Sequence, residues 1–331
     1  MILSMLLPPA NAADKWMLAK QMGVTHAITK AAPELSGLTP PYDFNSLKTV
    51  RENFAAAGIK LVGLEGDQFD MSAIKLGLDN RDECIEKYRQ MLRNMGRLDI
   101  NLLCFNFMAV IGWYRSRADI VERGGALTSC FDCSHVGGEL VEESLRISEE
   151  KVWENLFYFL DAVLPVAEEA GVKMGMHPDD PPLSPLMGVG RVLTSAANYN
   201  KVLDKFPSPN LGVTFCQATF KTMGEDLKKV SGEWLRRKKI FFIHIRDTEG
   251  GSKNFRETFI DEKPGFIADM LDHYHSHGFD GVIRSDHAPA MHGEAQKDFG
   301  GGISVGYQMM GHLFANGYIK GCCDALKIPL K

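Results

Sequence analysis

Eight short apolar runs alternate with longer segments of helical periodicity along the chain. The runs are rich in β-branched and aromatic residues, as buried strands are. They span residues 2–7, 26–30, 59–66, 101–108, 172–177, 211–216, 240–245 and 281–286. Apolar strands that alternate with helices predict a parallel sheet covered on its faces. Eight such units favour a single (β/α)8 TIM barrel that spans residues 1–331 as one catalytic domain.

The intervening segments carry helix boundary signals. Four of them end at a glycine that suits a helix C-cap: residues 43–58, 82–96, 149–171 and 264–278. Pro165 lies inside the third, where it is expected to kink or break the helix. Two connections are unusually long, residues 109–147 after the fourth strand and 246–263 after the seventh. Because both follow strand C-termini, we expect these loops to rise over the active face as lids or substrate contacts.

Four polar residues stand at or near the ends of four consecutive strands. They are His177, Cys216, His244 and Asp286. The C-terminal ends of barrel strands converge on one face, so these side chains are expected to meet there. A single buried histidine or cysteine is more often a packing residue. Four in register predict a site for a divalent transition metal, with Mn²⁺ first and Mg²⁺ or Fe²⁺ next; ligand preference also admits Zn²⁺.

Two further residues beside these strands carry candidate chemistry. Arg246 shares a strand face with His244, so it either binds a substrate carboxylate or forms an outward salt bridge. His287 follows Asp286 directly, and we assign it to acid/base work because histidine titrates near neutral pH. Cys130 and Cys133 form a CxxC without a second pair, which does not favour a zinc ribbon.

With these residues in place, the chain resembles the mannonate dehydratase family. Two stretches carry the resemblance most specifically, HPDDPP (177–182) and FNFM (105–108) through Trp113 to Arg115. Further support comes from residues 81–96, 212–220, 242–247 and 284–289. The resemblance implies a barrel similar to that of xylose isomerase and the metal ligands named above. It also implies that His287 is the acid/base residue, that Tyr307 is its partner beyond Gly300–Gly302, and that Asn106, Trp113 and Arg115 contact substrate.

The implied activity is removal of water from a sugar acid such as D-mannonate, giving 2-keto-3-deoxy-D-gluconate. Three departures from the family pattern fall around the substrate. Ser285 stands where we expect proline and Ala288 where we expect glycine. The segment 254–266 keeps Asn254, Phe255 and Glu257 but has no histidine. Two other functions stay open: a metal-dependent sugar isomerase or epimerase on the same barrel, and a non-catalytic metal-containing carbohydrate-binding protein.

Composition limits the partners. The net charge is −5, and the one short basic run, Arg236–Lys239, ends a helix-like segment, so we expect no nucleic-acid partner. No run of eighteen apolar residues is present, so we expect no membrane partner. Seven cysteines without a signal-peptide pattern indicate reduced thiols and a cytoplasmic location. We also expect a homo-oligomer.

Overall fold

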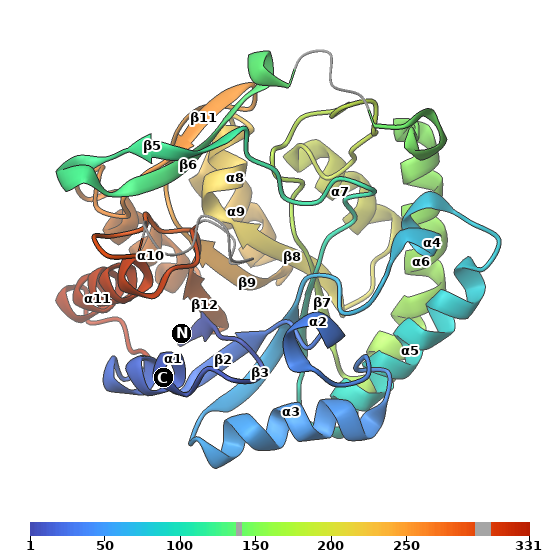
Figure 1. The fold of residues 1–331 in the computed structure, drawn as a ribbon, viewed down its shortest axis with the longest axis horizontal. Helices are drawn as coiled ribbons and strands as arrows, with labels where there is room; N and C mark the ends of the chain where they lie inside the picture. Colours follow the sequence, from blue (N-terminus) through green and yellow to red (C-terminus); the bar gives the residue numbers. More distant parts are fainter. Residues whose placement is uncertain (137–140, 295–305) are drawn as a thin grey trace.

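Eight parallel strands close into a barrel in the computed structural model, which describes residues 1–136, 141–294 and 306–331. Around the barrel they follow the order β1-β12-β9-β8-β7-β4-β3-β2 (Figure 1). Their bounds are β1 Ile2–Leu6, β2 His26–Thr29, β3 Lys60–Glu65, β4 Leu102–Phe105, β7 Lys173–Met176, β8 Leu211–Cys216, β9 Ile240–Ile245 and β12 Val282–Ser285. All eight predicted strands are therefore confirmed, and with them the TIM-barrel fold class.

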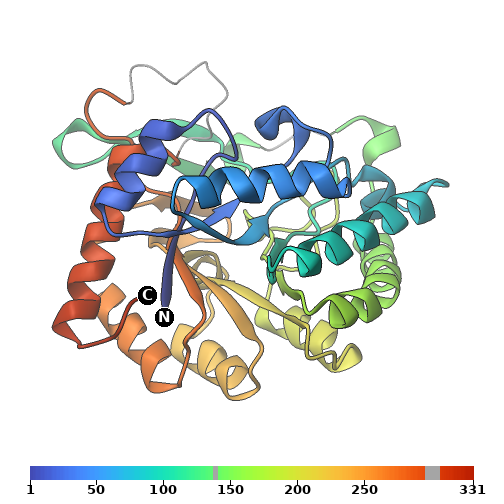
Figure 2. The same cartoon turned by 90° about the horizontal axis from the view of Figure 1, so that it is seen from below.

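Eight longer helices alternate with these strands and surround them (Figure 2). They are α1 Ala13–Gln21, α3 Phe44–Ala56, α5 Arg81–Arg97, α6 Glu149–Ala170, α7 Ala196–Lys205, α9 Leu227–Arg236, α10 Phe266–Ser276 and α11 Met309–Ala325. Three short helices, α2 Pro33–Ser36, α4 Ser72–Leu76 and α8 Gln217–Thr222, follow strand ends. Helix α6 continues through Pro165 without a break. Pro165 is exposed, so water can reach the carbonyl group that loses its helical partner.

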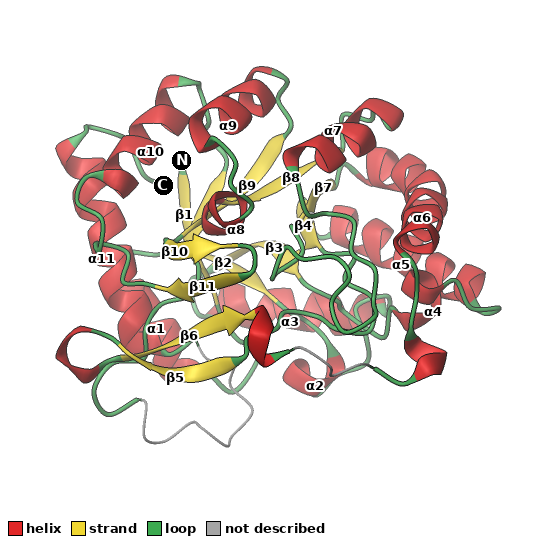
Figure 3. Cartoon of the chain, turned by 90° about the horizontal axis from the view of Figure 1, so that it is seen from above, coloured by secondary structure: helices red, strands yellow, loops and turns green. Residues whose placement is uncertain are grey.

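The two long connections form a second sheet instead of irregular loops. They contain β5 Arg117–Val121, β6 Leu127–Asp132, β10 Thr248–Gly251 and β11 Asn254–Glu257. These strands lie side by side in the order β10-β11-β6-β5 (Figure 3), with antiparallel pairing throughout. Short 3₁₀ turns lie at Arg123–Gly125, Cys133–His135 and Glu143–Leu145. The pairing of β6 with β11 fixes the two connections to each other, which the sequence did not predict.

Strand register brings the C-terminal ends of the barrel strands to one level. The pairing of β8 with β9 shifts between Val213 and Thr214, and beyond this irregularity Cys216 pairs with His244. His244 in turn pairs with Arg284 of β12. Neighbouring parallel strands therefore present a thiol, an imidazole and a guanidinium group at the same height.

The two ends of the chain meet on the barrel. The amide of Leu3 donates to the carbonyl of Lys331, and the amide of Lys331 donates to the carbonyl of Met1. Figure 1 and Figure 2 both show the termini next to each other. Among the described residues, no helix is both long enough and apolar enough to cross a membrane.

Helices α5 and α6 approach so closely that one position admits only glycine. A Cβ on Gly96 of α5 would overlap the carbonyl oxygen of Ala170, the last residue of α6, whereas a Cβ on Gly321 of α11 would meet nothing within 4 Å. We expect Gly96→Ala to destabilise the protein by about 1–3 kcal/mol, as overpacking does. Gly321→Ala should stabilise it by up to about 1 kcal/mol through helix propensity. Thermal denaturation should show opposite shifts in Tm; shifts of the same sign would contradict this close approach.

Candidate metal and active site

The carboxyl ends of β7, β8 and β9 bring three of the four predicted metal ligands together. His177 directly follows β7, Cys216 ends β8, and His244 lies one residue before the end of β9. One donor atom from each lies within 4.8 Å of the other two. Cys216 and His244 are fully buried, and His177 is half-buried. These three side chains form what we call the ligand group.

The free atoms of the ligand group fit a metal ion. His244 Nε2 is buried and has no hydrogen-bond partner among the described residues. His177 Nδ1 lies 2.8 Å from the carbonyl oxygen of Pro178, which leaves Nε2 of that ring free to bind. The hydroxyl of Thr219 donates to Cys216 Sγ at 3.1 Å. Two imidazoles and a thiolate suit a divalent transition metal.

Asp286, the fourth predicted ligand, lies beside the ligand group rather than within it. Its Oδ2 is 3.4 Å from Cys216 Sγ and 3.8 Å from His244 Nδ1. Arg246 Nε donates to the same oxygen at 2.6 Å, and Arg284 donates to Oδ1 at 3.0 Å. Burial alone would raise the pKa of Asp286, but the charges of Arg284 and Arg246 hold it well below its ordinary value. Asp286 is therefore ionised, and each of its oxygens accepts from a guanidinium group.

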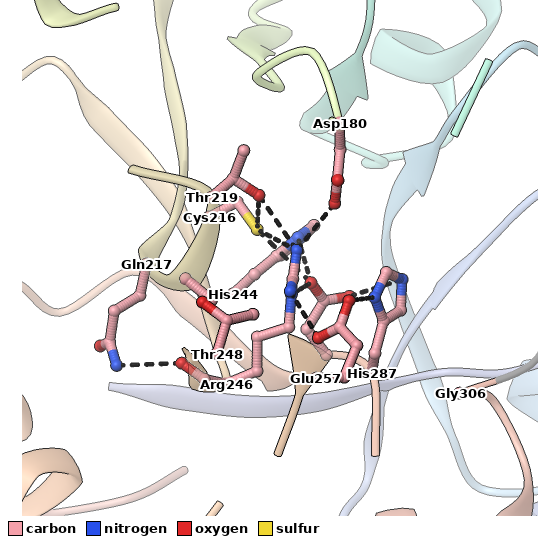
Figure 4. A network of polar contacts seen from close by, with 12 residues as sticks. Asp180, Cys216, Gln217, Thr219, His244, Arg246, Thr248, Glu257, His287 and Gly306 are labelled. Carbon is pink, nitrogen blue, oxygen red and sulfur yellow. Dashed lines mark hydrogen bonds and ion pairs between the residues drawn. The ribbon is translucent and has the colours of Figure 1, made fainter. Parts of the chain in front are cut away.

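Arg246 does not stand open to a substrate carboxylate, because its guanidinium group lies among carboxylates of the protein. It is 2 % exposed, and Figure 4 shows it between residues from separate segments. Besides the bond to Asp286, its Nη1 donates to Glu257 at 2.6 Å and its Nη2 to Asp180 at 2.8 Å. Nη2 also donates to the hydroxyl of Thr219 at 3.0 Å. Neither alternative drawn from the sequence, a substrate anchor or an outward salt bridge, matches this buried geometry.

Arg115, predicted to contact substrate, belongs to the same charged assembly. Its Nη1 and Nη2 donate to the two oxygens of Asp180 at 2.6 and 2.9 Å. Its Nη2 also donates to Glu257 at 2.5 Å. Burial would raise the pKa of Glu257, but Arg246 and Arg115 together lower it below its ordinary range. Arg115 therefore holds the carboxylates of Asp180 and Glu257 in place, and its guanidinium group is occupied by these protein partners.

A further pair completes this assembly at the barrel centre. Arg284 donates to both oxygens of Glu65, the last residue of β3, at 2.5 and 3.1 Å. The carboxylate–arginine cluster consists of Glu65, Asp180, Glu257, Asp286, Arg115, Arg246 and Arg284. Its four carboxylates exceed its three guanidinium groups by one negative charge. Loss of the Cys216 proton makes the excess two, which a divalent cation would balance.

His287 is fixed by one member of the cluster. Its Nδ1 lies 3.0 Å from Glu257 Oε1, so Nδ1 carries the proton that this carboxylate accepts, and Nε2 is left as a proton acceptor. The ring is buried and packs edge-on against Trp113 and Tyr307, with centroids 5.1 and 5.0 Å away. Asp180, Glu257 and His287 are close enough to share an ion, but Arg115 and Arg246 already pair with both carboxylates.

Tyr307 is a further neighbour of the Asp286 carboxylate. Its hydroxyl donates to Asp286 Oδ1 at 3.1 Å. Burial and the charge of Asp286 raise the pKa of Tyr307 well above its ordinary value, so the phenol stays protonated. The glycine stretch 300–302 that was expected to carry this tyrosine over the site lies outside the described residues. Ser285, one of the departures from the family pattern, faces away from the site and bonds His312 at 2.9 Å.

A cavity of about 160 Å³ connects these groups. Six of the predicted site residues line it: Asn106, Trp113, His177, Asp286, His287 and Tyr307. Asn106 lies where the chain leaves β4, and its Oδ1 accepts from Lys75 Nζ at 2.8 Å. We call this the inner cavity. Its lining includes His177 of the ligand group together with the predicted proton-transfer pair, His287 and Tyr307.

Sequence reasoning missed four charged residues of the cluster as members of the site: Glu65, Asp180, Glu257 and Arg284. Signals for them were present. Glu65 and Arg284 lie at strand ends, and Asp180 lies within HPDDPP. Glu257 belongs to the Asn-Phe-x-Glu segment. The CxxC cysteines remain free thiols.

The chain is similar to one family of known proteins over most of its length. The family model described as D-mannonate dehydratase (UxuA) matches residues 15–146 and 138–330. The chain belongs to the mannonate dehydratase family. It is 32% identical to mannonate dehydratase 2 of Halalkalibacterium halodurans over 92% of each chain. It is 30% identical to the mannonate dehydratase of Thermotoga maritima over 86% of each chain.

The solved structures place the family fold on the whole chain. The crystal structure of mannonate dehydratase from Streptococcus suis serotype 2 matches with a TM-score of 0.86 and 27% identity, over 100% of this chain and 97% of that one. A D-tagatose 3-epimerase-like protein matches with a TM-score of 0.62 at 13% identity, over 99% and 98% of the two chains. At 13% identity, the match to the epimerase-like protein shows only that the two chains share the barrel fold. Membership in the dehydratase family makes this chain a hydro-lyase by class.

Arg246 should contribute to the free energy of unfolding at neutral pH and contribute less in acid. Arg246→Met leaves three buried carboxylates without their shared cation, which we expect to cost about 3–5 kcal/mol at neutral pH. The pKa values of Asp180, Glu257 and Asp286 are all lowered in the folded state, so their stabilisation is present above their ordinary pKa values and is lost as the pH falls through the lowered ones. The gap in Tm between wild type and variant should therefore narrow below about pH 4.

Arg117→Met is the matched control, because Arg117 pairs with Asp119 and both side chains are exposed. Thermal denaturation of this control should leave Tm unchanged within the effect of a surface substitution. A Tm gap between wild type and Arg246→Met that does not narrow as the pH falls below about 4 would contradict the charged arrangement.

Proposed function

We propose that this protein removes water from a sugar acid, with D-mannonate as the first candidate and 2-keto-3-deoxy-D-gluconate as its product. The proposal combines family membership with one structural observation. The inner cavity of about 160 Å³ is lined both by His177 of the ligand group and by the pair His287 and Tyr307. The reacting part of a substrate would lie here next to His177, which would help to hold a metal, and next to the proton-transfer pair.

The metal is proposed as Mn²⁺, with Mg²⁺ or Fe²⁺ as alternatives. His177, Cys216 and His244 would hold it, with Asp286 beside them. Bound there, it would supply Lewis acidity to the substrate carboxylate and the neighbouring hydroxyl, which acidifies the α-proton. Arg246 and Arg284 position Asp286 next to the ligand group.

His287 and Tyr307 are proposed to move the two protons of the elimination. Glu257 holds the Nδ1 proton of His287, so Nε2 is the atom that accepts the proton from the carbon next to the carboxylate. The hydroxyl on the adjacent carbon leaves with a proton that the neutral phenol of Tyr307 supplies. The raised pKa of Tyr307 keeps that proton in place until it is needed.

The two alternatives from the sequence receive less support. The likenesses to epimerases stand at 13% identity and concern only the barrel. Arg246 no longer discriminates between a sugar acid and a neutral sugar, because protein carboxylates surround it. A metal-containing binding protein would have no need for His287 and Tyr307 on the cavity wall. The homo-oligomer, the cytoplasmic location and the absence of nucleic-acid and membrane partners remain predictions.

Turnover of D-mannonate should depend on the metal. We expect purified protein to form a 2-keto-3-deoxy acid from D-mannonate with Mn²⁺, and to lose this activity after treatment with a chelator. Metal analysis should find less metal in the double variant His177→Ala, His244→Ala than in wild type, because two ligands are gone. The double variant Cys130→Ala, Cys133→Ala, which changes free thiols outside the ligand group, is the control. No product from any aldonic acid with any of these metals would refute the proposed function.

His287 and Tyr307 should act on turnover rather than on metal binding. His287→Asn should keep the metal and lose about a hundredfold or more in kcat, as expected when a general acid/base is removed. Tyr307→Phe should also keep the metal and lose activity, by a smaller factor if the hydroxyl only positions substrate. Metal analysis of the same samples separates the roles, since loss of metal in His287→Asn would make this residue a ligand. Unchanged turnover in both variants would refute the pair.

A further inference from the structure

The inner cavity is too small to enclose a whole sugar acid with its surroundings. It measures about 160 Å³, whereas small-molecule sites commonly measure about 300–1,000 Å³. An outer cavity of about 860 Å³ adjoins it. Four residues line both cavities and form their common rim: Gly66, Asn106, Met108 and Trp113. A substrate whose reacting carbons lie beside His287 and Asp286 therefore extends its remaining carbons past this rim.

A buried lysine lies at the rim. Lys75 of α4 is 3 % exposed and lines the outer cavity. Its ammonium group donates to Asp67 Oδ2 at 2.6 Å and to Asn106 Oδ1 at 2.8 Å. Asn106 Nδ2 donates to the other oxygen of Asp67 at 3.4 Å. Lys75, Asp67 and Asn106 thus form a closed polar triad between the two cavities, which we call the rim triad.

The backbone around Lys75 is held firmly. Asn155 of α6 donates to the carbonyl of Lys75 at 3.0 Å. Gly77 ends α4 with a positive φ of 70°, and a Cβ there would collide with the side chain of Asn155. The ammonium group is therefore fixed at the rim instead of moving with solvent, as lysines usually do.

The rim triad offers the chemistry that a polyol chain requires. An ammonium group has three N–H donors, and the bonds to Asp67 and Asn106 use two of them. The carboxylate of Asp67 is 37% exposed and lines the outer cavity, so it can accept from a hydroxyl. A donor and an acceptor side by side match two neighbouring hydroxyl groups, which each donate and accept.

We propose that Lys75 is a specificity-determining residue that, with Asp67, binds the hydroxyl groups of the substrate beyond its reacting carbons. The site selects aldonic acids with five or six carbons over shorter ones with the same reacting centre. This inference rests on the proposed function, because it places the tail of that substrate. It assigns Lys75 no part in proton transfer or metal binding.

The test compares three acids that share their configuration at C2 and C3 and differ only in length: D-mannonate, D-lyxonate and L-erythronate. We expect Lys75→Met to lower kcat/KM for D-mannonate by about tenfold to a hundredfold, the range for a lost hydrogen bond to a charged group. The value for L-erythronate, which has one carbon beyond C3, should stay within about twofold. Lys75→Arg, which keeps the charge, should retain part of the preference for the longer acids.

Lys48→Met is the matched control, since Lys48 is exposed, pairs with Glu52 on α3 and is not among the residues that line the two cavities. It should leave the ratio of the three kcat/KM values unchanged. An equal loss on all three acids in Lys75→Met would overturn the proposal, since Lys75 would then only hold the rim in shape. No loss on any acid would overturn it as well.

Calorimetric binding of the same acids to Mn²⁺-loaded protein gives the comparison without turnover. Weaker binding of D-mannonate but not of L-erythronate by Lys75→Met supports the tail contact, and equal binding by variant and wild type refutes it. A wild type that binds D-mannonate but turns over none of the acids would refute the proposed function alone. The two proposals therefore fail on different measurements.

Discussion

The burial of Arg246 among three carboxylates is the interaction on which the site depends. Its partners Asp180, Glu257 and Asp286 come from the segment after β7, from the end of β11 and from the end of β12. A buried carboxylate without a partner is strongly unfavourable, so none of these segments can move away alone without leaving a charge exposed to an apolar interior. One guanidinium group therefore ties barrel strands to the second sheet.

This arrangement also prepares the site electrically for a cation. The cluster keeps Glu65, Asp180, Glu257 and Asp286 ionised, since the pKa of each is lowered despite burial. Its carboxylates outnumber its guanidinium groups, and the ligand group lies directly beside Asp286. A site with two imidazoles, a thiol and excess negative charge attracts a divalent metal more strongly than an uncharged site with the same ligands would. The same excess would oppose an anionic substrate unless the metal is bound first.

The second sheet has a chemical role beyond covering the barrel. Strand β11 carries Glu257, which orients His287, and the segment before β5 carries Arg115, which holds Asp180 and Glu257. The pairing of β6 with β11 holds these two segments at a fixed distance. The two long connections therefore position charged side chains of the site, namely Glu257 and Arg115. The barrel supplies the ligand group, and the added sheet supplies the carboxylate of Glu257 that orients His287, the proposed acid/base residue.

The sequence by itself determined the barrel and the place of three candidate metal ligands. The eight strands could be predicted because a strand buried on both sides must be apolar along its length, and the helices because their ends carry glycine caps. The ligand group followed because His177, Cys216 and His244 each stand near the end of such a strand, and parallel strands place those ends on one face. The place of His287 directly after Asp286 suggested that residue, and the family resemblance supplied Tyr307.

Only the tertiary structure decided how these groups are paired. Arg246 was expected to be open or outward, because its carboxylate partners lie 40 or more residues away in two of three cases and ion pairs over such distances leave no local pattern. The second sheet was missed because β5, β6, β10 and β11 have four to six residues each and lack the apolar pattern of the barrel strands. Lys75 reads as a surface lysine in sequence, and only the packing of α4 against α6 buries it at the rim. Periodicity fixes which elements form, whereas the partner of a buried charge depends on where distant segments meet.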